Sequence, residues 1–126
     1  MKIEISNGEL VDKITILAIK LVKIKSEEKL KNIRKEYELL TAEMIKLNIN
    51  EDTPEYKELL AINNKLWQIE DDIRLKEANQ QFDDEFIQLA RSVYFTNDER
   101  SKVKRRINEL TGSDLYEEKE YAKYQK

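Results

Sequence analysis

The chain contains no cysteine and no histidine among its 126 residues. It therefore has no disulfide bond, no thiol nucleophile, no zinc site of the thiolate or imidazole type and no imidazole base. Any catalysis has to come from carboxylates, lysine, arginine, tyrosine or a hard metal ion held by oxygen ligands. The absence of cysteine fits a reducing compartment, and we expect a cytoplasmic protein.

Turn-forming residues and long apolar runs are also scarce. Two glycines and one proline are too few for the many tight turns of a β-sandwich or barrel. No uninterrupted apolar run is longer than that of residues 16–19, so we expect no membrane-spanning helix and no signal-peptide core. The length predicts a single domain over residues 1–126.

The charges are numerous but balanced, with 39% charged residues and a net charge of −3. Five of the seven residues 100–106 are cationic. We interpret this stretch as a solvated helix face, with an anion or phosphate pocket as the alternative. Nucleic-acid binding is not expected, because the chain is net acidic and no aromatic residue interleaves these cations for base stacking.

Apolar residues recur at spacings of three and four along most of the chain, which is typical of amphipathic helices. Residues 6–9 form a capping box that opens a first helix, apolar around most of its circumference and therefore central. Polar residues interrupt the pattern near Ser26, so residues 7–48 form either two helices or one kinked helix. Thr53 and Pro54 open a third helix that we expect to reach about Asn79.

The second half of the chain carries further helix signals. Asp83 or Asp84 is predicted to cap a fourth helix, and residues 96–99 form a second capping box that predicts a fifth helix ending at Gly112. We expect residues 113–126 to be a short helical tail and residues 1–5 an extended arm. The predicted fold is all-α, an antiparallel bundle of four to five helices with a short extended N-terminal arm.

A polar stripe borders the apolar stripe of the third helix and contains Asn63, Trp67, Glu70, Arg74 and Glu77. The stripe therefore places an aromatic edge, an amide, carboxylates and a guanidinium along one side of the helix. Such a set of groups favours the binding of a small polar ligand. The alternative is intrahelical support by the Glu70–Arg74 pair, with Trp67 as half-buried core.

Carboxylates three residues apart lie on one helix face, as in all-helical nucleotide pyrophosphohydrolases that hold Mg²⁺. Glu9 with Asp12, and Glu55 with Glu58, have this spacing, although their order is reversed relative to those enzymes. Mg²⁺ would be needed for this lesser alternative, and otherwise no cofactor and no metal site are expected. A pocket of the chorismate-mutase type, without that family's motif, would use Arg74, Arg91, Arg100 and Lys104.

Several separated strings together resemble an uncharacterised family of short all-helical proteins, a domain of unknown function seen in bacteria and marine phages. They are residues 4–17, 66–74, 90–94, 97–100, 107–108, 112–113 and 117–121. The resemblance covers nearly the whole chain and is weakest over residues 26–55. Lys119 and Glu120 depart from it, since a serine is expected before Tyr121. The genes of relatives sometimes lie near sugar-transfer genes, which implies a carbohydrate or nucleotide-sugar ligand.

The polar motifs of that family favour a binding site over a purely structural role. We expect one pocket for a small anionic or sugar/nucleotide-like ligand, with raised carboxyl pKa values. Arg74, Arg100 and Lys104 would bind an anion, Trp67 would stack on a ring, and Glu70 or Asp12 would act as base or metal ligand. The candidate residues are Glu9, Asp12, Lys13, Asn63, Trp67, Glu70, Arg74, Arg91, Tyr94, Arg100, Lys104 and Asn108.

The alternative function is a structural or adaptor bundle that self-associates as a homo-oligomer or binds a partner protein. It predicts an exposed apolar stripe of Tyr37, Leu40, Met44 and Leu47. No residue is assigned as catalytic, and the sequence leaves open whether the chain is an enzyme.

Overall fold

The computed structural model describes residues 1–124 and contains four helices within them. They are α1 (Asn7–Lys23), α2 (Glu27–Ile45), α3 (Pro54–Ala78) and α4 (Asp84–Thr111). This part of the chain contains no strand, which confirms the all-α prediction. None of these helices is long and apolar enough to cross a membrane.

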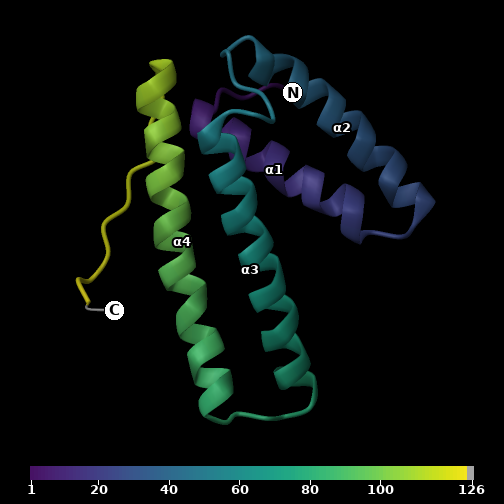
Figure 1. The fold of residues 1–126 in the computed structure, drawn as a ribbon, viewed down its shortest axis with the longest axis vertical. Helices are drawn as coiled ribbons and strands as arrows, with labels where there is room; N and C mark the ends of the chain where they lie inside the picture. The colour runs from purple at the N-terminus through teal and green to yellow at the C-terminus, as the bar shows by residue number, and fades with distance from the viewer. Residues whose placement is uncertain (125–126) are drawn as a thin grey trace.

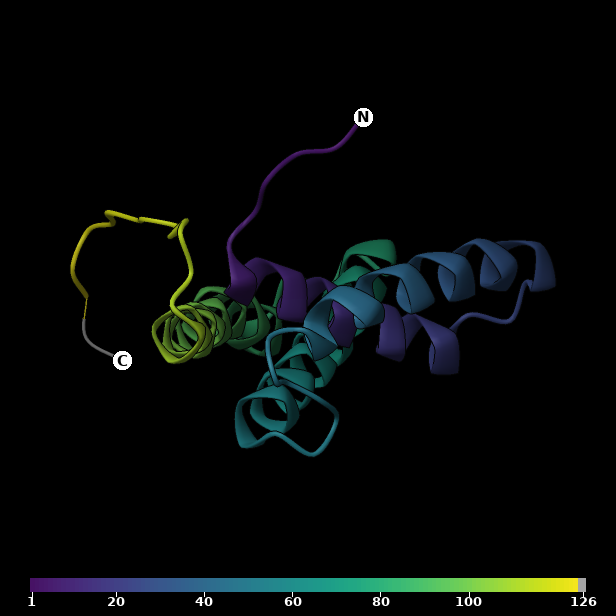
Figure 2. The same cartoon turned by 90° about the horizontal axis from the view of Figure 1, so that it is seen from above.

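The helices form two antiparallel hairpins (Figure 1). The long pair of α3 and α4 lies along the long axis of the molecule, and the pair of α1 and α2 extends to one side of it (Figure 2). α1 packs against each of the other three helices, whereas α2 packs along α1. The apolar first helix is therefore central, as its sequence predicts.

The hydrophobic core lies where α1 crosses the α3–α4 pair. Val11 and Ile14 of α1 meet Leu59 of α3 and Val103 and Ile107 of α4, and all five are almost fully buried. The predicted adaptor stripe on α2 belongs to this core as well. Met44 is 1% exposed, and its stripe neighbours pack against the cluster as partly buried side chains. The prediction of an exposed stripe is therefore wrong, because α2 turns that face towards α1.

The structure answers one question about helix boundaries that the sequence left open, and it contradicts a second expectation. The break near Ser26 separates two helices, and the Ser26 hydroxyl accepts a hydrogen bond from the Lys29 amide. The predicted fifth helix does not begin at residues 96–99, since α4 runs without a break through them and Thr96 is 1% exposed. Neither glycine nor proline interrupts α4, and its inward face continues through the polar Thr96 and Arg100.

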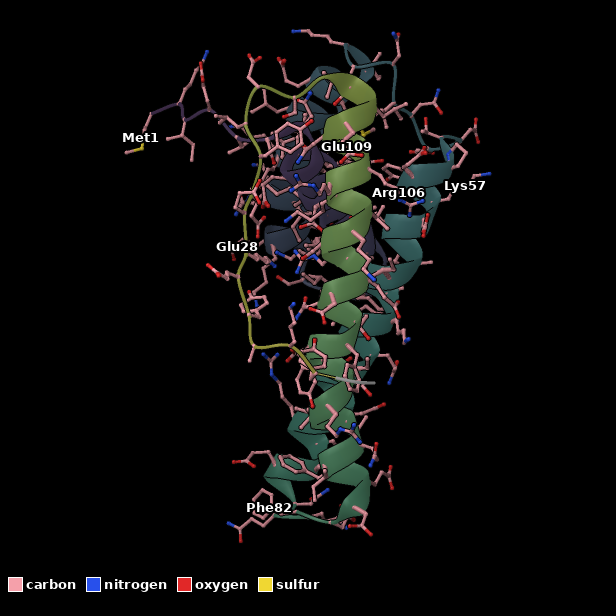
Figure 3. The ribbon with its side chains drawn as sticks, turned by 90° about the vertical axis from the view of Figure 1, so that its left-hand side faces the viewer. Met1, Glu28, Lys57, Phe82, Arg106 and Glu109 are labelled. Carbon is pink, nitrogen blue, oxygen red and sulfur yellow. The ribbon has the colours of Figure 1, made fainter. Side chains whose placement is uncertain are left out.

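The tail is extended, and the prediction of a helical tail is wrong for residues 113–124, while residues 125–126 lie outside the described residues. Gly112 ends α4 in the left-handed conformation, at φ 63°. The chain then turns back and runs beside α4, in front of the bundle in Figure 3. Residues 1–5 form neither helix nor strand.

The far end of the α3–α4 pair projects beyond α1 and ends near Phe82 (Figures 1 and 3). No residue from 70 to 95 is fully buried. Leu75, Phe82 and Ile87 are at least half exposed there. We call this segment the distal arm.

Candidate ligand-binding cleft

A buried ion pair joins the first and last helices. Asp12 of α1 is 1% exposed, and Arg100 of α4 donates to both of its carboxylate oxygens. The Arg100 Nε lies 2.8 Å from Asp12 Oδ1, and its Nη2 contacts Asp12 Oδ2. Asn63 of α3 donates from Nδ2 to Asp12 Oδ1 at 2.9 Å and to the Thr15 hydroxyl at 2.8 Å. Three helices therefore meet at one carboxylate.

This geometry keeps Asp12 ionised. Burial raises the pKa of the Asp12 carboxyl, but the hydrogen bonds from Arg100 and Asn63 outweigh burial and hold the pKa below its ordinary value of 3.8. The Asp12 hydrogen bonds also raise the pKa of Arg100. The expectation of raised carboxyl pKa values is therefore wrong for Asp12. An ionised carboxylate that is clamped by a guanidinium fixes structure and is poorly suited to act as a general base.

A second ion pair lies farther along α4. The ammonium of Lys104 donates to Glu9 Oε2 at 2.7 Å and to Glu117 Oε2 of the tail at 3.0 Å. Burial lowers the pKa of Lys104, but the bonds to Glu9 and Glu117 outweigh burial and raise it. Lys104 therefore joins α1 to the tail as a charged group.

The first backbone amides of α1 donate hydrogen bonds to acceptors at the end of α4 and just after it. The amide of Gly8 donates to Asn108 Oδ1 at 2.6 Å, and that of Asn7 to the Ser113 hydroxyl at 3.0 Å. The Glu9 amide donates to the Ser6 hydroxyl at 3.2 Å. Because these amides already have acceptors, this helix terminus is not an open anion site. Asn108 acts here as a helix cap.

A cleft with a volume of about 300 Å³ opens beside the Asp12–Arg100 pair, between α1, α3 and α4. Trp67, Glu70 and Arg74 line it from α3. Asn97 and Arg100 line it from α4, and Ile16 and Ile19 contribute an apolar wall from α1. The remaining lining residues are Asn63, Leu66 and Asp71.

Charges of both signs surround this cleft. The Arg74 guanidinium lies 3.6 Å from the Glu70 carboxylate; the Arg74 side chain is largely exposed to solvent and that of Glu70 is partly buried. Arg100 donates to Asp12 and also to Asn97 Oδ1 at 3.3 Å. A guanidinium has five N–H donors, so these bonds do not use all of them, and the Arg100 side chain lines the cleft. The cleft therefore offers donors, acceptors and an aromatic edge, and its field is not strongly positive.

The candidate residues divide among several places and do not form one pocket. Asn63, Trp67, Glu70, Arg74 and Arg100 line the cleft, and Asp12 lies behind it beneath Arg100. Lys13 is exposed on α1. Glu9, Lys104 and Asn108 lie together between the start of α1 and α4.

Arg91 and Tyr94 lie in an aromatic cluster with the end of the tail. The Arg91 guanidinium carbon is 5.3 Å from the centre of the Phe95 ring, and the Tyr94 and Tyr124 rings are 5.5 Å apart. These contacts attach the tail to α4. Arg91 lines a different cavity from Arg74 and Arg100, and Lys104 pairs with Glu9 elsewhere, so the cations of a mutase-like pocket do not converge.

The sequence indicated only weakly two residues that make contacts at these sites, Thr15 and Glu117. Thr15 accepts the Asn63 amide and donates its hydroxyl to the Asp12 carbonyl at 2.7 Å, yet it lies within an apolar stripe. Its spacing of three residues from Asp12 is the only local signal. Glu117 belongs to a tail whose path along α4 no periodicity indicates.

The carboxylates of the proposed magnesium pairs do not gather. Among residues 1–124, no group of three or more acidic side chains is placed to hold a metal ion. Glu9 pairs with Lys104 and Asp12 with Arg100, and Glu58 lies 2.6 Å from the Arg106 guanidinium. These ion pairs use the oxygens that a hard cation would require.

A wider surface groove of about 670 Å³ lies between α3 and α4, away from the Asp12–Arg100 pair. Its lining includes Glu58, Arg105, Arg106 and Glu109, which pair with one another. It has no aromatic side chain in its lining. The smaller cleft at Trp67 is therefore the better candidate for a ligand.

A family model matches residues 1–125, and it describes a family of unknown function, DUF6165. No curated protein and no solved structure matches the chain.

Proposed function

The chain belongs to the DUF6165 family, and we propose that it binds a small carbohydrate-like ligand in the cleft between α1, α3 and α4. The observation that carries this proposal is the presence of Trp67, Glu70, Arg74 and Arg100 around one cavity. Its volume of about 300 Å³ lies at the lower end of the range for small-molecule sites and suits a single sugar ring.

The mixed polarity of the lining supports a polyhydroxylated ligand over a simple anion. Sugar hydroxyls donate to carboxylates such as Glu70 and accept from guanidinium groups such as Arg74. Trp67 offers a broad apolar surface for the C–H face of a ring. Arg100 already shares its charge with Asp12, and Glu70 and Asp71 add negative charge. A multiply charged anion therefore gains little here.

The chain contains one tryptophan, so its fluorescence reports on this cleft. We would titrate neutral monosaccharides, sugar phosphates and nucleotide sugars, and follow both Trp67 emission and the melting temperature. A ligand that binds the folded chain raises its stability by mass action. The expected result is a saturable change in emission with a matching increase in melting temperature for at least one sugar-bearing compound.

Variants make this experiment specific to the cleft. Arg74→Ala removes a largely exposed side chain, so the fold should survive while binding weakens about tenfold. Lys65→Ala is the matched control, because Lys65 is an exposed cation of the same helix that does not line the cleft. A folded wild-type chain with no response to the whole panel would overturn the proposal, as would equal binding by Arg74→Ala.

A second candidate function is self-association through the distal arm. Leu75, Phe82 and Ile87 expose large apolar side chains there, and two antiparallel hairpins of this length pack readily as a four-helix bundle. The occupant would be a second copy of this chain. Light scattering over a range of concentrations tests it: Ile87→Lys should convert a dimer into a monomer, and a wild-type monomer at high concentration would exclude it.

We further propose a cytoplasmic location and a bacterial or phage origin. The location is supported by the lack of cysteine, which suits a reducing compartment. The origin is supported by the resemblance of the separated motifs to proteins of such organisms. Fractionation of a native host, followed by immunoblotting of the soluble and membrane fractions, tests the location.

A further inference from the structure

The cationic stretch of residues 100–106 is divided among different partners in the fold. Arg100 pairs with Asp12, and Arg106 reaches Glu58 on α3. The other three cations, Lys102, Lys104 and Arg105, line a cavity on the side of α4 that the tail covers. The proposed cleft does not use this group of cations.

The tail places two carboxylates on these cations. Glu117 lies 3.0 Å from the ammonium of Lys104, and Glu118 lies 3.3 Å from the guanidinium of Arg105. Lys119 donates to the Ser101 hydroxyl at 3.0 Å. The Lys104 contact makes the pKa of the Glu117 carboxyl lower than usual, so that carboxylate stays charged at neutral pH. The tail thus holds anionic groups against a basic helix face.

A small cavity of about 200 Å³ remains between the tail and the helix. Four cations line it, three from α4 and Lys119 from the tail, against the two carboxylates Glu117 and Glu118. Ser101 and Asn108 add polar groups to its wall. Glu9 and Glu109 also pair with Lys104 and Arg105, so the charges around the cavity balance while the tail is in place. They become net positive when Glu117, Glu118 and Lys119 leave.

We propose that Lys102, Lys104 and Arg105 form a binding site for the phosphate group of a small molecule, and that Glu117 and Glu118 occupy this site in the ligand-free chain. Phosphate oxygens accept the same charge-assisted hydrogen bonds as carboxylate oxygens. A phosphate gathers in one group about as much negative charge as Glu117 and Glu118 carry together, and it competes with both for the same donors. Binding of phosphate therefore displaces the tail from α4.

Glu118 is held weakly enough to leave Arg105, and Lys104 does not depend on Glu117 as its only counter-ion. The side chains of Glu118 and Arg105 are 73% and 52% exposed, and ion pairs in such positions contribute little to stability. Lys104 keeps Glu9 as a partner when Glu117 leaves, so it does not become an unpaired buried charge. The site is separate from the cleft at Trp67, and this proposal does not depend on carbohydrate binding.

The first test is calorimetric titration with inorganic phosphate, with ionic strength held constant by chloride. The E117Q/E118Q variant removes the competing charges, and we expect it to bind phosphate about threefold to tenfold more tightly than the wild type. D114N/E120Q is the matched control, because it removes the same two charges from exposed positions of the tail. R105Q should weaken binding about tenfold and leaves the Lys104–Glu9 pair intact.

The second test follows the tail in the wild-type chain and needs no variant. Trypsin cleaves after Lys119, which lies against Ser101 while the tail is attached. Phosphate should increase the rate of this cleavage several-fold above that in chloride of equal ionic strength. Equal cleavage in both salts would overturn the proposal. Phosphate affinity that is the same in the wild type, E117Q/E118Q and R105Q would overturn it as well.

Discussion

Gly8 faces the backbone of Lys104 so closely that a Cβ at Gly8 would lie 2.3 Å from the Lys104 carbonyl oxygen. Backbone atoms cannot move aside as a flexible side chain does, so α1 and α4 would have to separate. We expect Gly8→Ala to destabilise the chain by about 1–3 kcal/mol, the usual cost of overpacking. Urea denaturation would measure this loss of stability as a lower midpoint, with no change in the dependence of the unfolding free energy on urea concentration.

The matched control for this prediction is the other glycine. Gly112 adopts φ 63° with nothing within 4 Å of its added Cβ, so its requirement is conformational. Asparagine adopts this region more readily than other non-glycine residues, so we expect Gly112→Asn to cost about 1 kcal/mol or less. Equal losses for Gly8→Ala and Gly112→Asn would contradict the close approach of the two helices.

Asp12→Asn should be strongly destabilising although it preserves the shape of the side chain. It removes the negative charge that two Arg100 nitrogens contact, and leaves a partly buried guanidinium without its counter-ion. Breaking a buried ion pair in this way costs about 3 kcal/mol. Equilibrium unfolding in urea checks the value, and a loss below about 1 kcal/mol would show that Asp12 does not hold the three helices together.

Arg106→Ala should behave differently, although it also breaks a short ion pair. The Arg106 and Glu58 side chains are each about half exposed, at 50% and 49%. Water screens this contact, so we expect a loss of less than about 1 kcal/mol. Measuring both variants in the same urea series separates the effect of burial from that of the contact itself.

The pH dependence of stability has a definite sign. The pKa values of Asp12 and Glu117 are lowered on folding, from ordinary values of 3.8 and 4.5, so the unfolded chain binds more protons in acid. The stability from these pairs is complete above the unfolded values and is lost as the pH falls through the lower, folded values. Asp12→Asn should therefore show a shallower loss of stability than the wild type below pH 3.8. An equally steep loss in both would contradict this assignment.

Asn108→Ala should destabilise the start of α1, because it removes the acceptor of the Gly8 amide. Loss of a helix cap costs about 1 kcal/mol, with values up to about 2. Asn108→Asp is the informative companion, since it restores an acceptor at the positive end of the helix dipole. Thermal unfolding of both variants should place Asn108→Asp above Asn108→Ala, and the reverse order would argue against the capping role.

The starts of helices could be predicted from the sequence where a neighbouring side chain caps the helix. Ser6, Ser26 and Asp83 accept amide hydrogen bonds at three helix starts. The same logic failed at residues 96–99, which have a capping-box pattern within the interior of α4. The core-facing stripe of α4 contains the polar residues Thr96 and Arg100, so the apolar pattern is interrupted there. Asp12, the partner of Arg100, lies 88 residues away in the sequence, and no local pattern indicates that contact.

The candidate cleft was predictable in part. Helical periodicity aligned Trp67, Glu70 and Arg74 on one side of α3, and they do line one cavity. Periodicity does not reveal which other helix faces that stripe, so the separation of Arg100 from Lys104 and Arg91 could not be read from it. The path of the tail depends on ion pairs such as Lys104–Glu117, which have no local pattern at all.

The first turn of α1 depends on acceptors from the other end of the chain: Gly8 on Asn108 and Asn7 on Ser113, 100 and 106 residues later. During synthesis the N-terminus leaves the ribosome first, and these amides have no protein acceptor until the last helix emerges. The bundle therefore closes only after residues 108–113 have been synthesised. A message truncated before the codon for Asn108 would yield a chain whose central helix has lost this cap.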